Sequence, residues 1–183
     1  MLSKEDLELE YQRIAFWINN MDTKISFALG ATGVLIGFIF SNEDFSKTLE
    51  NHSKTLQLWN ESSIKSAVFF VLFGLTIILL VAAMWCFLNG LKAKINPRKY
   101  KQPHMVSSSN IFWGDISKHN YFSYKYRMDN SESNDWVKDM QTQIYINSCI
   151  CAQKAKFYNI GIFCLKSALI GFLIYHIWMW FFL

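Results

Sequence analysis

The residues of this chain that could do chemistry gather in one stretch, where basic and aromatic side chains alternate. The aromatic members are Phe112, Trp113, Tyr121, Phe122, Tyr124 and Tyr126, and the basic members are Lys118, Lys125 and Arg127. Cationic groups attract an anion, and aromatic faces stack on a planar ring. The stretch is therefore compatible with a small, planar, anionic ligand. Basic and aromatic residues are also favoured beside anionic lipid headgroups, so a role at the membrane surface is the alternative.

No catalytic constellation accompanies this stretch. The four histidines (52, 104, 119 and 176) are scattered along the chain. Cys149 and Cys151 stand two apart on an expected helix, so they point to different faces and do not make a zinc or redox pair. G-x-S-x-G, P-loop and G-x-G-x-x-G motifs are absent from the sequence. We expect a protein that is not an enzyme and that carries no metal or cofactor.

Three apolar segments must position the basic and aromatic stretch. They cover residues 25–41, 67–90 and 159–183, in a chain that is 52% apolar and only 17% charged. At about 1.5 Å per residue, each is long enough, or nearly so, to cross the roughly 30 Å hydrocarbon core of a bilayer. A soluble chain of 183 residues has too few polar residues to cover three such helices. The sequence thus predicts an all-α integral membrane protein with three transmembrane helices.

The distribution of Lys and Arg predicts the orientation of these spans. Residues 91–158 carry eleven basic residues, whereas residues 1–24 and 42–65 carry three each. Because basic loops stay inside, segment 91–158 and the N-terminal segment 1–24 are predicted to be cytoplasmic. The 42–66 loop is then outside, and the C-terminus of the 159–183 span lies at the outer face of the membrane.

The first and third spans are expected to continue as long helices in the cytoplasm. A weak capping pattern at Ser3 and Asp6 opens the first, which we expect over residues 3–41. Its apolar seam has alternating steps of four and three: Leu7, Tyr11, Ile14, Ile18, Met21 and Ile25. Asn134 is the expected cap of the last helix. Asn147 lies on the stripe of that helix and is a candidate for setting its register.

Small and charged residues near the first span suggest how the helices pack. Ser26, Gly30, Gly33 and Gly37 share one helix face, which allows close helix association, although glycine is common in membrane spans generally. Asp22 lies within a turn of the span. It is expected either to pair with Lys24 or Lys166 and hold the first and third helices in register, or to stay hydrated at the interface. These are the candidate packing and gating residues, together with Asn147.

Three clusters resemble one protein family over nearly the whole chain. They are Asp22-Thr23-Lys24 before the first span, Phe112-Trp113-Gly114-Asp115-Ile116 in the loop, and a run before the last span. That run comprises Gln143, Ile144, Asn147, Ser148, Ile150, Lys154 and Tyr158. The clusters are similar to those of the transmembrane effectors of bacterial Pycsar anti-phage systems. The chain departs from that pattern where Trp113 precedes Gly114, and where three residues separate Lys154 from Tyr158.

The resemblance implies a membrane effector that a second messenger switches on during phage infection. In Pycsar systems the messenger is a cyclic mononucleotide, cCMP or cUMP, and the effector impairs the inner membrane in abortive infection. The ligand contacts that we expect are Trp113, Asp115, Lys118, Tyr121, Lys125 and Arg127. A loop of this size is too small to enclose a nucleotide alone, so flanking helices or a second subunit of a homo-oligomer would complete the site.

Other functions fit a small membrane protein of this kind. It could be a non-signalling module, such as a toxin–antitoxin or assembly partner, or a small channel subunit, or a retron-type membrane effector. The partners that we expect are a lipid bilayer, a cyclic nucleotide ligand and further copies of the chain in a homo-oligomer, and we expect no nucleic acid.

Overall fold

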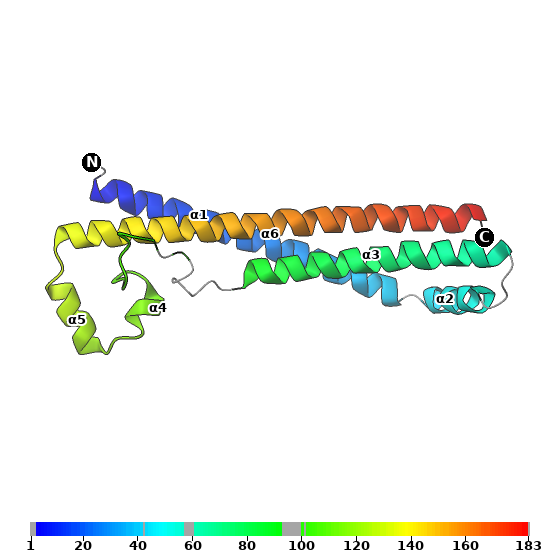
Figure 1. Cartoon of the computed structure of the whole chain (residues 1–183), viewed down its shortest axis with the longest axis horizontal. Coiled ribbons are helices and arrows are strands. Elements are labelled where there is room, and N and C mark those ends of the chain that lie inside the picture. The colour runs from blue at the N-terminus through cyan, green and yellow to red at the C-terminus, as the bar shows by residue number, and fades with distance from the viewer. Residues whose placement is uncertain (1–2, 42, 57–60, 93–99, 101, 183) are drawn as a thin grey trace. The chain divides into compact units, whose positions relative to one another are not determined.

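The computed structural model describes residues 3–41, 43–56, 61–92, 100 and 102–182. Every regular element among these residues is a helix, which confirms the all-α prediction (Figure 1). The helices are α1 (Lys4–Ser41), α2 (Glu43–Leu56), α3 (Glu61–Leu91), α4 (Trp113–Ile116), α5 (Tyr121–Asp129) and α6 (Ser133–Phe182). Helices α1, α3 and α6 are long and apolar enough to cross a membrane, as expected for three spans.

The chain divides into two compact units, and helices α1 and α6 each contribute one part to both. The first unit contains residues 1–23 and 92–155, and the second contains residues 24–91 and 156–183. The boundaries of these units at residues 23 and 155 lie close to residues 25 and 159, where the first and third spans are expected to start.

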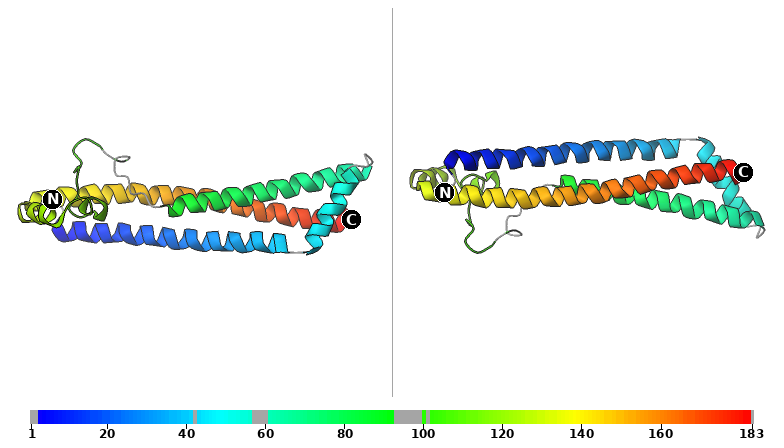
Figure 2. Two further views of the ribbon diagram at one scale, coloured as in Figure 1. Left: turned by 90° about the horizontal axis from the view of Figure 1, so that it is seen from below. Right: turned by 90° about the horizontal axis from the view of Figure 1, so that it is seen from above.

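The second unit has an apolar core formed by three helices. Its buried residues are Ile25, Ala28 and Ile39 from α1, Leu80, Ala83 and Phe87 from α3, and Leu165 and Ala168 from α6. Figure 2 shows these three helices running side by side. Their outer faces carry fully apolar, exposed side chains such as Phe27, Val71 and Phe163. Apolar surface of this extent is stable only when lipid replaces water around it.

Glycines in α3 and α6 mark where the helices of the second unit approach most closely. A methyl group added at Gly161 would lie 2.5 Å from Phe87 Cε1, and one at Gly90 would lie 2.9 Å from Ile25 Cδ1. One at Gly171 would lie 2.9 Å from Thr76 Oγ1. Because the end of α3 meets the start of the α1 span, and the middle of α3 meets the later part of α6, α3 runs antiparallel to both.

Helix α2 occupies the segment that the sequence analysis treated only as a connecting loop. Leu49, His52 and Leu56 follow at helical spacing and form its inner face. The His52 ring is buried against α3, where its Nδ1 lies 2.9 Å from Ser66 Oγ and its plane stacks on Phe69. The inner residue at the centre of this face is a histidine rather than an apolar residue, which explains why hydrophobic periodicity missed the helix.

In the first unit, the start of α1 follows the sequence prediction closely. The Asp6 N–H donates to Ser3 Oγ at 3.1 Å, and the Asp6 carboxylate accepts from the Ser3 N–H and hydroxyl at 3.0 and 2.8 Å. This confirms the capping pattern, and these hydrogen bonds lower the pKa of Asp6. Leu7 is buried, and Tyr11, Ile14, Ile18 and Met21 are half-buried, so the predicted seam is the inner face of the helix.

The start of α6 differs from the prediction by one position. The helix begins at Ser133, so Asn134 is inside it and the expected cap at Asn134 is wrong. Instead, the Asp135 carboxylate accepts from the Glu132 N–H at 3.4 Å. An acidic side chain in the first turn is favourable because it faces the positive end of the helix dipole.

Candidate ligand-binding site

An irregular segment over residues 102–112 lies along α6 in the first unit. Side chains of α6 bind it about one helical turn apart: Tyr145 OH accepts from Gln102 Nε2 at 2.6 Å, and Thr142 Oγ1 accepts from the Val106 N–H at 3.3 Å. At the far end, Asp139 Oδ2 accepts from the Asn110 N–H at 2.7 Å. Polar side chains of α6 therefore accept backbone hydrogen bonds of this segment that a neighbouring strand or helical turn would otherwise accept.

Asp115 organises the turn that joins this segment to α4. Its carboxylate accepts from the Ser109 N–H at 3.1 Å and from Lys118 Nζ at 2.6 Å. Ser109 Oγ in turn accepts from the N–H groups of Ile111 and Phe112 at 3.0 and 2.9 Å. Burial raises the pKa of Asp115, but the Lys118 and Ser109 hydrogen bonds and nearby positive charge outweigh it, so the net pKa is lowered.

Arg127, near the end of α5, reaches back to the same segment. Its Nη1 donates to Ser108 Oγ at 2.9 Å, and its Nη2 donates to the Ser108 carbonyl at 2.8 Å. Nη1 also lies 2.6 Å from His119 Nε2, which must accept and therefore carry no proton on that nitrogen. Among the described residues no carboxylate forms an ion pair with this guanidinium, although its positive charge helps to lower the pKa of Asp115.

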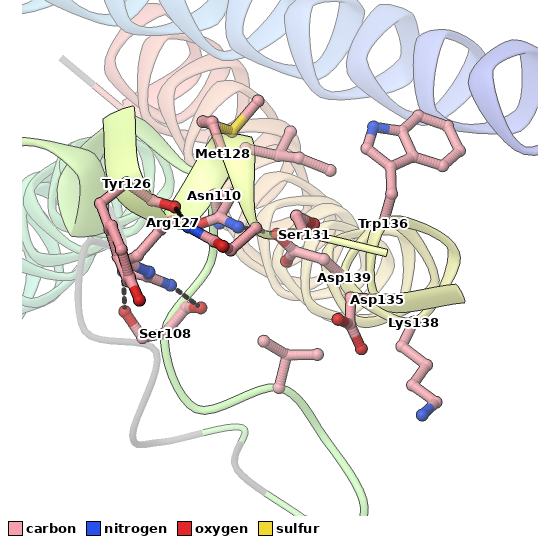
Figure 3. A pocket seen from close by; sticks show the side chains of 13 residues that line it. Ser108, Asn110, Tyr126, Arg127, Met128, Ser131, Asp135, Trp136, Lys138 and Asp139 are labelled. Carbon is pink, nitrogen blue, oxygen red and sulfur yellow. Dashed lines mark hydrogen bonds between the residues drawn. The ribbon is translucent and has the colours of Figure 1, made fainter. Parts of the chain in front are cut away.

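These elements enclose a cavity of about 430 Å³ within the first unit (Figure 3). It is lined by Val106, Ser108, Asn110 and Ile111 of the segment, by Tyr126, Arg127 and Met128 of α5, by Asn130 and Ser131, and by Asp135, Trp136, Lys138 and Asp139 of α6. Small-molecule sites in proteins have volumes of about 300–1,000 Å³, with apolar walls and a few placed polar groups. The cavity matches that description.

Two oxygen atoms in the cavity lining are buried and make no hydrogen bond. They are Asn110 Oδ1 and Asp139 Oδ1. Asp139 is only 4% exposed, although its other carboxylate oxygen is bonded to the Asn110 N–H. Buried acceptors are nearly always satisfied in native proteins, so these two atoms are exceptions among the described residues.

The structure brings only one of the six expected ligand contacts into this cavity, namely Arg127. Trp113 is 63% exposed and Tyr121 is 78% exposed, and Lys125 is exposed on α5. Asp115 and Lys118 pair with each other outside the cavity lining. The cavity residues that sequence reasoning missed include Asn110, Trp136, Lys138 and Asp139. The sequence pattern that could have indicated the α6 residues of this set is the spacing of polar residues, at steps of three to four, in the first turns of that helix.

The candidate packing residues take up different positions. Asp22 pairs with Lys154 of α6 at 2.5 Å, a partner that the sequence analysis did not consider. Lys24 and Lys166 are exposed, and Asn147 is half-buried on the α6 stripe. Gly30, Gly33 and Gly37 are exposed, with nothing within 4 Å of an added methyl group, so they do not pack inside the chain.

The fold and the apolar outer surface define a class: this is a multi-pass, all-helical membrane protein whose first unit contains a cavity. The chain belongs to the Pycsar effector family, because the Pycsar effector protein domain (PycTM) matches residues 6–182. It is 30% identical over 176 residues to the Pycsar effector protein GmPycTM of Gulbenkiania mobilis, covering 93% of this chain and 90% of that protein. No solved structure matches it. The family comprises membrane effectors of anti-phage cyclic nucleotide signalling, which confirms the resemblance.

Proposed function

We propose that a cyclic mononucleotide, cyclic CMP or cyclic UMP, binds in the cavity of the first unit and switches this effector on. The bound effector then impairs the integrity of the bacterial inner membrane and stops growth of the infected cell. The observation that carries the proposal is the cavity of about 430 Å³ with Arg127 in its wall. Arg127 forms no ion pair with a described carboxylate, and we propose that its guanidinium, whose charge also acts on the nearby Asp115 carboxylate, binds the cyclic phosphate.

The other cavity residues suit the remaining parts of such a ligand. Tyr126 and Trp136 supply aromatic surface for a planar base, and Lys138 supplies a second positive charge at the mouth. Trp136 is itself positioned by Lys4, whose ammonium lies 4.6 Å from the centre of the indole ring. The expected contacts on the exposed surface, Trp113, Lys118, Tyr121 and Lys125, then serve the anionic membrane surface or a neighbouring subunit.

Ligand binding reaches the membrane through α6. The cavity is bounded by the first two turns of this helix, and the same helix continues without a break to Phe182. In the first unit, α6 is joined to α1 by the Asp22–Lys154 pair, and α1 also continues into its span. A ligand that favours one packing of α1 against α6 shifts the population of two packings of the same long helices.

The active form is a homo-oligomer in the inner membrane, with the first unit in the cytoplasm where the messenger is made. The Lys and Arg excess of residues 91–158 supports this orientation. The exposed face with Ser26, Gly30, Gly33 and Gly37 is open for close contact with a second copy.

Membrane potential in living cells tests the function directly. Cells that express the protein together with a cyclase for cyclic CMP or cyclic UMP should depolarise, whereas cells with a dead cyclase should not. Arg127→Gln should abolish depolarisation or raise the required messenger concentration at least about tenfold, because it removes the charge that holds the phosphate. Arg13→Gln is the matched control, since Arg13 is an exposed arginine of α1 outside the cavity.

Three results would contradict the proposal. Intact membrane potential under saturating levels of both messengers would exclude a cyclic pyrimidine nucleotide as the trigger. Conductance without any messenger would indicate a constitutive channel. Full activity of Arg127→Gln would move the binding site away from the cavity.

A further inference from the structure

The guanidinium group of Arg127 is held by two residues from neighbouring segments. Its Nη1 and Nη2 donate to Ser108 Oγ and to the Ser108 carbonyl at 2.9 and 2.8 Å (Figure 3). Nη1 also lies 2.6 Å from Nε2 of His119, in the turn between α4 and α5. A guanidinium has five N–H groups, and these contacts use three of them. The N–H of Nε and the second N–H of Nη2 remain, along one edge of the planar group.

This remaining edge of Arg127 has accessible surface. Among the described residues none accepts a hydrogen bond from Nε, yet Nε is not one of the buried polar atoms that lack a partner. The atom is therefore accessible, in a side chain that lines the cavity. Two parallel N–H groups on one edge are what an arginine needs to bind a phosphate through two hydrogen bonds.

His119 can make its contact with Arg127 only as a neutral ring. Nη1 donates and cannot accept, so Nε2 must accept with its lone pair, and the ring proton must be on Nδ1. Protonation of Nε2 would place two donors and two positive charges against each other at the same 2.6 Å. Gain of a proton by His119 therefore breaks this contact and leaves the arginine held by Ser108 alone.

We infer that His119 is a positioning residue for the messenger: its neutral imidazole holds Arg127 with the Nε–Nη2 edge ready for the phosphate, and its protonation releases the arginine. The inference rests on the proposed function, because it concerns how the same cavity holds the cyclic phosphate. An arginine that is already fixed loses less side-chain entropy when the ligand binds. Messenger affinity therefore falls as the cytosol becomes acidic.

The other charged groups near His119 include one ion pair. Asp115 and Lys118, from α4 and the turn after it, pair at 2.6 Å. Burial raises the pKa of Asp115, but hydrogen bonds and nearby positive charge outweigh it, so this carboxylate stays ionised in neutral and mildly acidic solution. Helix α6 adds three charged residues to the cavity wall: Asp135, Lys138 and Asp139. Imidazole is the side chain whose charge ordinarily changes between about pH 5 and about pH 8.

The tautomer of His119 tests the geometry without any ligand. Full-length protein in lipid nanodiscs, isotope-labelled at its histidine nitrogens, is examined by NMR near neutral pH, and the spectrum of His119→Gln assigns the His119 signals. We expect a bare Nε2 and a protonated Nδ1. A proton on Nε2 overturns the inference, whichever nucleotide the protein binds.

Messenger affinity at two pH values tests the consequence. The same nanodiscs are titrated by calorimetry with cyclic CMP and, separately, with cyclic UMP at about pH 7.5 and about pH 5.5. For the nucleotide that binds, the wild type should bind at least about tenfold more weakly at the lower pH, because the protonated ring no longer holds the arginine.

Two variants of His119 separate its role as an acceptor from its role in packing. His119→Leu keeps most of the volume but has no acceptor, so binding at the higher pH should weaken at least about tenfold. His119→Gln offers a carbonyl oxygen that cannot gain a proton. It should regain most of the affinity that the leucine variant loses, and it should keep that affinity at the lower pH.

His104→Asn is the matched control, because it removes an exposed imidazole outside the cavity lining. His104 has a φ of 71°, a left-handed conformation that asparagine also adopts readily. This variant should keep the full pH dependence of the wild type.

The outcomes distinguish this inference from the proposed function. Binding of a nucleotide with equal affinity at both pH values overturns the inference and leaves the proposed function standing. The same conclusion follows if His119→Leu binds like the wild type, or if His119→Gln loses affinity on acidification as steeply as the wild type does. Absence of binding by either nucleotide at the higher pH overturns the proposed function and, with it, the inference.

Discussion

At the scale of single residues, the Asp22–Lys154 pair joins α1 to α6 in the first unit. Its two partners differ in environment: the Lys154 side chain is 6% exposed, whereas that of Asp22 is 37% exposed. A buried ammonium depends on a negative partner much more than a carboxylate that water still reaches. Substituting Asp22 and substituting Lys154 should therefore destabilise the protein by different amounts.

Asp22→Asn should destabilise the protein more than Lys154→Met does. The first variant leaves a buried ammonium facing a neutral amide, which costs about 3 kcal/mol for a broken buried pair. The second leaves a partly hydrated carboxylate, and methionine fills the apolar space. Thermal unfolding in detergent measures this, with an expected fall of roughly 6–10 °C for Asp22→Asn and less than half of that for Lys154→Met.

Glu10→Gln is the matched control for this pair, because Glu10 is an exposed α1 carboxylate that pairs with Arg13 at 3.5 Å. Exposed pairs of this kind contribute about 0–1 kcal/mol, so the control should unfold close to the wild type. Equal effects of Asp22→Asn and Lys154→Met would show that the difference in burial does not govern this contact.

At the scale of helices, the glycines separate into those that pack inside the chain and those that face outward. Gly161 lies against the ring of Phe87 from α3, whereas Gly33 has nothing within 4 Å of its position. Both are glycines in apolar helices, but only Gly161 contacts another helix of the same chain and so contributes to packing within it. The outward glycines are left for contact with lipid or with another copy.

Gly161→Leu should therefore reduce the stability of the chain, whereas Gly33→Leu should affect only the association of subunits. Leucine at 161 forces Phe87 out of its site, at a cost of about 1–3 kcal/mol or more for overpacking, and should lower the unfolding temperature of the purified protein. Leucine at 33 has room within the chain, so the unfolding temperature should stay near that of the wild type while the oligomer dissociates.

Native gels and thermal unfolding in one detergent read both effects. An unchanged oligomer in Gly33→Leu would remove the Gly30, Gly33 and Gly37 face from subunit contact. An unchanged unfolding temperature in Gly161→Leu would show that the contact between Phe87 and Gly161 is not tightly packed.

At the scale of the whole molecule, the composition of the first unit bears on topology. The N-terminal part of α1 and the described residues between 100 and 155 belong to one compact unit, which is expected to lie on one side of a bilayer. That unit carries the excess of basic residues, and basic segments are usually retained in the cytoplasm. The orientation that we propose therefore has the first unit in the cytoplasm and α2 in the periplasm.

Labelling with a membrane-impermeant maleimide checks this orientation. In a background without the four native cysteines, Ser53→Cys on α2 should react in intact spheroplasts. Glu132→Cys, before α6, should react only after the membrane is opened. Both positions are exposed, so access to solvent within the protein does not limit either reaction. The reverse labelling pattern would place the cavity outside the cell, away from any messenger made in the cytosol.

The sequence by itself determined the membrane class, the three long apolar helices, the inner face of α1 and the family. These properties depend on the length, hydropathy and spacing of residues that are close along the chain. Only the tertiary structure decided that Asp22 meets Lys154, that Gly161 rather than Gly33 packs against a helix, and that the cavity combines Asn110, Arg127 and Asp139. Each of these depends on contacts between segments far apart in sequence, which no local pattern of hydrophobicity or charge specifies.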